Sequence, residues 1–375
     1  MTVQDMIKEL IAIADDPKAA VNGYLKKTGG KAIGCVPVYT PEELVHAAGM
    51  LPVGIWGADN INLDLSKQYF PAFCCSVVFT AMELALRGTF DMLSGAIIPG
   101  MDDTLITFGQ NWKSGVPQVP YIPLVYPQNR KLEAGVKFLM AELSRVKKRL
   151  EEISGKTITE EAMLNSIRIY NEHRYIMREF VELAASHPNT VDNYMRSRVI
   201  KSGWFMLKEE HTEKVKAINA ELKKLPQEKF AGKRVVITGF IYDSKELLDV
   251  LEENKLRIVG DDLAHETRQF RTDVPAAGSA LESLARQWSN IEGCSYAYDP
   301  KRLRGSLVAK LAKEVKADGV IFALLKFCEV EEYDQPILVE DIERENIPVT
   351  VLEVDQQSGS AEQIRTRVQT FAEML

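Results

Sequence analysis

Short apolar runs alternate with amphipathic segments along most of the chain, and this alternation predicts strands separated by helices. Eight runs are apolar and short enough to be strands, at residues 31–35, 51–56, 93–99, 119–126, 234–238, 256–259, 320–325 and 349–353. Strands that are separated by helices favour parallel sheets. Between residues 131 and 225 the apolar positions follow the helical period instead. The pattern therefore predicts an α/β protein in which a helical insert separates two parallel sheets.

The 375 residues are too many for one typical core, which favours several domains. We expect two Rossmann-like lobes that face each other across a cleft. The expected parts are an N-terminal helix (1–30), a first α/β lobe (31–145), a helical subdomain (146–231) and a second α/β lobe (232–375).

Composition and charge exclude several classes of partner. The chain is 46% hydrophobic and 26% charged with a net charge of -7, so no basic nucleic-acid footprint is expected. No apolar run reaches the roughly 18 to 20 residues that span a bilayer. The N-terminal segment is an acidic amphipathic helix rather than an export signal. These features predict a cytoplasmic protein that binds neither nucleic acid nor membrane.

Five cysteines do not make a disulfide framework, so structural thiols, metal ligands and redox centres are the alternatives. Cys35, Asp102 and Cys328 lie at or just after the ends of predicted strands. Cys75 lies at a helix start, where the dipole lowers a thiol's pKa, so it is a better candidate thiolate than Cys74. Thiolates that converge suit zinc or an iron–sulfur cluster. No CxxC pair is present, and the spacing alone leaves scattered structural thiols as an alternative.

Other polar segments give weaker signals. Neither a GxGxxG turn after a strand nor a Walker lysine motif is present, so nucleotide binding is not expected. His265 lies beside Asp261, Asp262 and Glu266 and is either a proton-transfer group or part of a solvated polar loop. The solvated loop is the favoured interpretation.

Six segments carry a resemblance to a known family over nearly the full length of the chain. They are KAIGCVPVYTPEELVHAAGMLPVGIWG (31–57), FPAFCCSVV (70–78), IIPGMDDTL (97–105), DDLAHETRQFRTDVP (261–275), KFCEVEEYD (326–334) and EVDQQ (353–357). In these segments the chain resembles the beta subunits of 2-hydroxyacyl-CoA dehydratases, the 2-hydroxyglutaryl-CoA dehydratase D-component and benzoyl-CoA reductase family.

The resemblance implies a [4Fe–4S] cluster that three cysteines hold in the cleft between the lobes. Cys75 and Cys328 match two of those cysteines. The third belongs to a Cys-Asp pair in the family, and this chain has Asp102-Asp103 there. Either Asp102 binds iron through oxygen, or Cys35 supplies the missing thiolate, or the cluster is labile or absent.

The resemblance also implies a role in anaerobic amino-acid fermentation, as the beta subunit of an oxygen-sensitive lyase that acts as a heterodimer. A homologous alpha subunit binds most of the acyl-CoA, and an ATP-dependent iron–sulfur activator protein injects one electron. A ketyl radical then expels its 2-hydroxyl group, the 3-proton is removed and the electron returns, which leaves an (E)-2-enoyl-CoA. This subunit relays the electron. Glu43 matches a family carboxylate near the active centre and is a candidate for proton handling. The alternatives are a cluster-less structural subunit and a benzoyl-CoA-reductase-like electron-transfer subunit.

Overall fold

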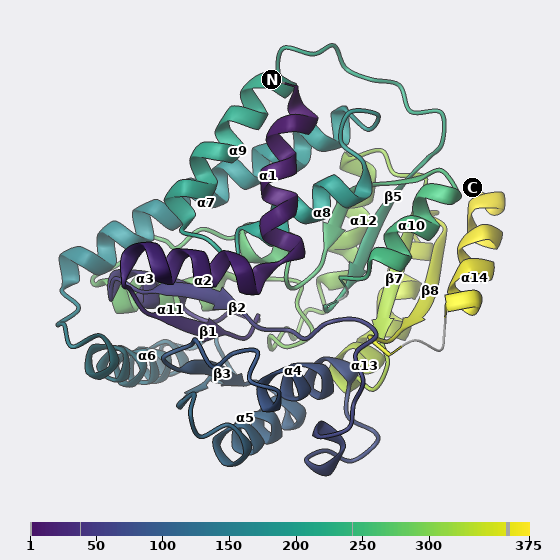
Figure 1. The fold of residues 1–375 in the computed structure, drawn as a ribbon. Helices are drawn as coiled ribbons and strands as arrows, with labels where there is room; N and C mark the ends of the chain where they lie inside the picture. The colour runs from purple at the N-terminus through teal and green to yellow at the C-terminus, as the bar shows by residue number, and fades with distance from the viewer. Residues whose placement is uncertain (1, 38, 242, 358–360) are drawn as a thin grey trace.

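The computed structural model describes residues 2–37, 39–241, 243–357 and 361–375, which form two parallel four-stranded sheets with helices around them (Figure 1). The first sheet contains β1 (Ala32–Cys35), β2 (Leu51–Gly54), β3 (Ala96–Gly100) and β4 (Tyr121–Val125). The second contains β5 (Lys233–Gly239), β6 (Leu256–Asp262), β7 (Gly319–Leu325) and β8 (Val349–Val354). All eight predicted strands are present, so the predicted α/β class with two parallel sheets is confirmed.

The two sheets share one strand order. It is β2-β1-β3-β4 in the first sheet and β6-β5-β7-β8 in the second, and every pairing is parallel. In each sheet the chain steps from the first strand to one neighbour and then returns to the other side of that strand. This reversal makes a crevice beyond the carboxyl ends of β1 and β3, and of β5 and β7, where open α/β sheets place their ligands.

The helices next to the first sheet differ from the sequence-based expectation at one place. They are α3 (Glu42–Ala47), α4 (Ser76–Leu86) and α5 (Asp103–Gly115), with a short 3-10 turn η1 (Ser66–Gln68). Helix α5 was not predicted, because Gly109 and the polar residues near it hide its period. Asp102 starts this helix by accepting a hydrogen bond from the Leu105 N–H at 2.7 Å.

The helical insert packs beside the N-terminal segment. It contains α6 (Glu133–Ser154), α7 (Glu160–Ser186), α8 (Asn193–Ser202) and α9 (Lys208–Leu222). The expected single N-terminal helix is two helices, α1 (Val3–Asp15) and α2 (Pro17–Thr28), because Asp16 ends one and caps the next. Helix α1 packs against α8 and α9, and α7 packs along α9 (Figure 1).

The second sheet is covered by α10 (Lys245–Glu253), α12 (Arg304–Glu314), α13 (Glu329–Glu343) and α14 (Ala361–Met374), with a 3-10 turn η2 (Thr267–Gln269) after β6. Helix α11 (Ala280–Asn290) packs instead against α6 and α7, and its buried side chains share a core cluster with the first sheet. Helix α13 begins directly after Cys328, and the acidic run that follows this cysteine is its first turn. The sequence pattern predicts a helix in this segment only at residues 341–346, so α13 starts earlier than predicted.

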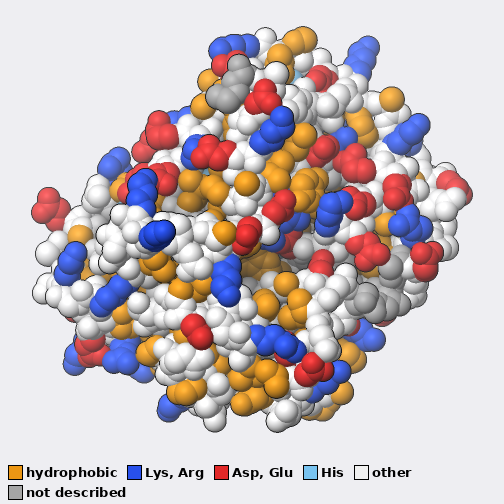
Figure 2. Space-filling view, viewed as in Figure 1, with side chains coloured by type: hydrophobic (Ala, Val, Ile, Leu, Met, Phe, Trp, Pro, Cys, Tyr) orange, Lys and Arg blue, Asp and Glu red, His pale blue; other side chains and the backbone are white. Residues whose placement is uncertain are grey.

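One apolar core cluster contains side chains of both sheets, including Leu51 and Ile98 from the first and Ile237 and Ile321 from the second. The two lobes therefore share buried surface and are not separate globules. Figure 2 shows acidic and basic side chains interspersed over one face of the molecule. Within the described residues, no helix combines the length and apolar character that crossing a membrane requires.

Candidate functional site

Three of the candidate ligands occupy the same kind of position, the N-cap of a helix. Cys75 precedes α4, Asp102 precedes α5 and Cys328 precedes α13. Asp102 and Cys328 also occupy corresponding places in the two sheets, since they follow β3 and β7, the third strand of each. The first helical turns direct free N–H groups and the positive end of the helix dipole toward these residues.

The hydroxyl group of Tyr296 lies beside these residues. Its oxygen lies 3.5 Å from the Cys328 Sγ. The same hydroxyl lies near the Asp102 carboxyl group and counteracts the rise in its pKa that burial causes. Cys75 lies close enough that its charge raises the pKa of both Tyr296 and Cys328. The structure thus brings Cys75, Asp102 and Cys328 together, and adds a tyrosine that the sequence patterns did not single out.

Burial dominates the chemistry of the two thiols. It raises the pKa of Cys75 to about 12, although the N–H groups of Val78 and Val77 act in the opposite direction. The expectation that the α4 N-terminus lowers this pKa is therefore wrong for the metal-free chain, because loss of solvent outweighs the helix terminus. Burial also raises the pKa of Cys328 well above its ordinary value, and the nearby Glu331 and Cys75 raise it further.

Among the described residues, no cationic side chain is one of the groups that act most strongly on the charges of this site. Besides each other, the charged groups that act most on Cys75, Asp102, Cys328 and Tyr296 are acidic residues or another thiol. They are Cys74, Asp103, Glu329 and Glu331. Buried anions normally pair with a cation or bind a metal. These thiols and this carboxyl group can therefore ionise together only if a positive group joins them.

Space is available beside the site. Asp102 and Tyr296 line a cavity of about 460 Å³ together with Ser295 and Glu329. Cys74 lines a different hollow of about 400 Å³, which Phe70, Phe79 and Phe327 also line. The two adjacent cysteines therefore have different surroundings.

Cys35 does not join this group. It is the last residue of β1, is fully buried, and belongs to a core cluster with Leu44 and Ile97 that contains neither Cys75 nor Cys328. Its thiol faces the Ile33 carbonyl at 3.7 Å. Burial raises the pKa of this thiol well above its ordinary value, so it is a packed core residue in this structure.

Glu43 lies at a different cavity. Its buried carboxylate pairs with Arg174, and the neighbouring Glu42 pairs with Lys208 at 2.9 Å. These side chains line an enclosed space of about 70 Å³ that His265 also borders. None of the three N-cap residues of the site lines this space.

His265 lies in a turn after β6, but only 3% of its surface is exposed, so the prediction that this loop is solvated is wrong at His265. Neither of its ring nitrogens has a hydrogen-bond partner among the described residues. Burial lowers its pKa to about 4, and the imidazole is therefore neutral at pH 7. Asp261 and Asp262, which were assigned to the same loop, are the last residues of β6.

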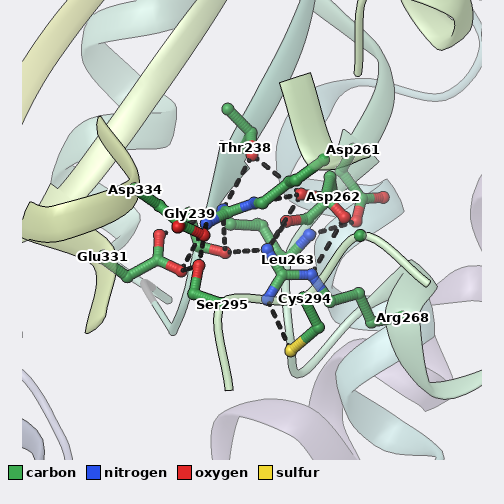
Figure 3. Close-up of polar contacts among 12 residues, drawn as sticks. Thr238, Gly239, Asp261, Asp262, Leu263, Arg268, Cys294, Ser295, Glu331 and Asp334 are labelled. Carbon is green, nitrogen blue, oxygen red and sulfur yellow. Dashed lines mark hydrogen bonds and ion pairs between the residues drawn. The ribbon is translucent and has the colours of Figure 1, made fainter. Parts of the chain in front are cut away.

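A second polar cluster lies next to the thiols, and we call it the arginine network (Figure 3). Asp262 pairs with Arg268, Arg271 and Arg304, which hold its pKa far below the ordinary value against the effect of burial. Arg304 also binds both oxygens of Glu331, at 2.7 and 3.0 Å. Ser295 donates to the same carboxylate at 2.8 Å. The network therefore connects the loop that carries Tyr296 to the first turn of α13, next to Cys328.

The donor set can be tested against the cofactor that the sequence implies. Across the ranges that the structure describes, no three His, Cys, Asp or Glu side chains converge tightly enough to hold a single metal ion. A cubane cluster binds each protein ligand through a different iron atom, so its ligands stand farther apart. Two buried thiols and a partly buried carboxyl group fit such a group in chemistry, and in charge because none of their strongest electrostatic neighbours among the described residues is cationic.

Comparisons with known proteins agree with the resemblance. A family model described as 2-hydroxyglutaryl-CoA dehydratase, D-component, matches residues 37–375. The (R)-phenyllactyl-CoA dehydratase beta subunit of Clostridium sporogenes is 48% identical over 97% of this chain and 96% of its own length. Lactoyl-CoA dehydratase subunit beta of Anaerotignum propionicum is 44% identical over 100% of this chain and 99% of its own length. The (R)-2-hydroxyglutaryl-CoA dehydratase subunit beta of Acidaminococcus fermentans is 39% identical over 100% of both chains.

Proposed function

The chain belongs to the 2-hydroxyglutaryl-CoA dehydratase D-component family, and we propose that it is the beta subunit of an (R)-2-hydroxyacyl-CoA dehydratase, a lyase. Three relatives that match it from end to end are beta subunits named for three different 2-hydroxyacyl-CoA substrates. We expect the chain to act as a heterodimer with a homologous alpha subunit, which supplies most of the acyl-CoA site.

The observation that supports a redox role is the uncompensated group of Cys75, Cys328 and Asp102. We propose that these residues hold a [4Fe–4S] cluster, with Asp102 as an oxygen ligand where the family has a third cysteine. The separate core position of Cys35 argues against the alternative that it supplies the third thiolate. Of the two candidates for the third ligand that the sequence leaves open, we therefore propose Asp102.

The proposed reaction needs an electron because a proton at carbon 3 of the substrate is too weakly acidic for a side-chain base. A bound cluster would supply single-electron transfer, with the electron coming from an ATP-dependent iron–sulfur activator protein. The substrate radical anion would expel its 2-hydroxyl group as hydroxide and lose the 3-proton, and return of the electron would leave an (E)-2-enoyl-CoA.

The residues of this chain would bury the cluster and hold its charge. The N-termini of α4, α5 and α13 direct their positive ends at the proposed ligands. Surrounding apolar side chains exclude water from the two thiols. Glu43 remains a proposal for proton handling. Its ion pair with Arg174 keeps it in place at the smaller cavity.

A second candidate function is a structural subunit that supports a catalytic alpha chain without a cluster. The observation that favours it is the carboxyl group of Asp102 where the family has a thiol. Iron–sulfur clusters prefer soft thiolate ligands, so a cluster with one oxygen ligand is bound less tightly than a cluster with three thiolates.

Iron and sulfide counting after anaerobic purification separates the two candidates. We expect about four irons per chain, the content of one [4Fe–4S] cluster. The purified chain is then combined with its alpha subunit and activator and assayed with 2-hydroxyacyl-CoA substrates. An iron-free chain that supports full dehydration contradicts the cluster, and an iron-containing complex that dehydrates none of these substrates contradicts the dehydratase.

A further inference from the structure

Tyr296 is held in a fixed place beside the proposed cluster ligands. It lies in the loop between α11 and α12. Its ring packs against Phe240, which follows β5, with ring centroids 4.6 Å apart. This packing orients the ring so that its hydroxyl group lies 3.5 Å from the Cys328 Sγ.

The arginine network fixes the other end of this contact. Glu331 accepts hydrogen bonds from Ser295, the residue before Tyr296, and from both terminal nitrogens of Arg304 (Figure 3). Glu331 also belongs to the first turn of α13, which starts after Cys328. One buried carboxylate thus links the backbone on both sides of the contact between the phenol and the sulfur.

Chemistry decides which atom donates once iron is bound. A cysteine that ligates iron is a thiolate and has no proton to donate. A tyrosine side chain ordinarily carries an O–H that can donate, so Tyr296 supplies the proton of this contact. If Asp102 also binds iron, its carboxylate is engaged there, and the O–H of Tyr296 turns to the sulfur. Hydrogen bonds to the sulfur atoms of an iron–sulfur site are one of the levers that set its reduction potential.

We infer that the Tyr296 hydroxyl donates a hydrogen bond to the Cys328 thiolate and thereby raises the reduction potential of the proposed cluster. The inference rests on the proposed function, because it needs the cluster to be present. The hydrogen bond stabilises the extra negative charge of the reduced cluster more than that of the oxidised one. Tyr296 thus adjusts the reduction potential of the cluster through the Cys328 sulfur and does not itself bind iron.

The test compares Tyr296→Phe with Tyr298→Phe in the anaerobically purified chain. Each change removes one hydroxyl oxygen from the same loop, but Tyr298 is 47% exposed and has no hydrogen bond to a proposed ligand among the described residues. We expect both variants to keep the wild-type iron content and visible absorption. A redox titration followed by electron paramagnetic resonance should show a more negative potential for Tyr296→Phe alone.

A third variant, Ser295→Ala, keeps the phenol but removes one link to Glu331. We expect its potential to shift in the same direction by less than that of Tyr296→Phe. An unchanged potential in Tyr296→Phe at full iron content would overturn the inference and leave the proposed function standing. Loss of iron from a folded Tyr296→Phe chain, with folding checked by circular dichroism, would also overturn it, because Tyr296 would then be a ligand. A wild-type chain that takes up no iron would overturn both the inference and the cluster.

Discussion

Two buried polar groups meet at the loop of residues 294–296, and they are built in opposite ways. In the arginine network, each buried carboxylate has a guanidinium partner, as Asp262 and Glu331 show. In the thiol group, which we define as Cys75, Cys328, Asp102 and Tyr296, the strongest electrostatic neighbours are acidic or neutral. The two groups lie side by side, since Ser295 contacts one and Tyr296 the other.

The difference distinguishes a polar cluster whose charges are balanced within the chain from a site whose charges need a bound cation. Arginines hold the pKa of Asp262 far down, so this carboxylate is ionised and its charge is balanced within the chain. Burial raises the pKa of Cys75, Cys328 and Asp102 instead. A buried site of acids without a base is stable only while its groups are protonated or bound to a cation. The first group balances its charges within the chain, and the second is the site that we propose for the iron–sulfur cluster.

The largest effect is expected from removing a proposed thiolate ligand. Cys75→Ala or Cys328→Ala should abolish the visible absorption and the iron content of the anaerobically purified chain, because each removes one attachment of the cluster. Cys74→Ala is the matched control and should leave both nearly intact, since its side chain lines a separate hollow. Equal loss of iron in all three variants would mean that the thiol group is not the binding site.

The next largest effect is expected in the arginine network, and on stability rather than on iron. Glu331→Gln leaves Arg304 with a buried charge that is only partly balanced, so we expect a loss of roughly 3–5 kcal/mol in the free energy of unfolding. Denaturant unfolding of the metal-free chain measures it. Glu340→Gln is the control in the same helix. Its partner Arg344 and Glu340 itself are 65% and 61% exposed, and the loss should be under about 1 kcal/mol. Similar losses in the two variants would contradict a structural role for the network.

Substitutions of Asp102, with a smaller expected effect on stability, separate its role as the N-cap of α5 from its proposed role as an iron ligand. Asp102→Ala removes the N-cap of α5 and should cost about 1 kcal/mol of stability. Asp102→Asn keeps a good capping side chain and should cost little, because asparagine caps as well as aspartate. If Asp102 is an iron ligand, both variants should change the absorption and resonance spectra of the cluster. A wild-type spectrum in Asp102→Asn would leave Asp102 with the capping role only.

The smallest effect is expected at Cys35, which gives a second contrast with the thiol group. Cys35→Ala removes one buried sulfur atom from a packed core, so we expect a loss of about 1 kcal/mol, in the range of other single-group deletions. Its iron content should equal that of the wild-type chain. Loss of absorption in Cys35→Ala together with a normal spectrum in Asp102→Asn would make Cys35 the third ligand.

The sequence predicts the sheets well and the geometry of the site only in part. Buried parallel strands are nearly continuous apolar runs, so all eight could be found from local pattern. Helix α5 was missed although Asp102 and Asp103 carry an N-terminal signal, and α13 was started too late although Glu329 and Glu331 follow Cys328. These two helix starts were readable from the capping rules, and they would have shown that the candidate ligands share one structural position.

Other features depend on tertiary structure that no local pattern encodes. Tyr296 lies in a loop without periodicity, and only the packing of the second lobe brings it to residues 75 and 102 of the first. Cys35 and Cys328 both follow the pattern of a cysteine near a strand end. Cys35 still belongs to β1 and points into the core, whereas Cys328 stands three residues beyond β7. The pKa of Cys75 was misjudged because burial cannot be seen in the sequence.

Diffraction at the iron absorption edge, from anaerobic crystals of the chain bound to its partner subunit, would show whether the thiol group holds iron. We predict an iron signal bonded to the sulfur atoms of Cys75 and Cys328, at the N-termini of α4 and α13. Crystals that diffract well but show these two side chains in separate interiors, with no iron between them, would contradict this prediction.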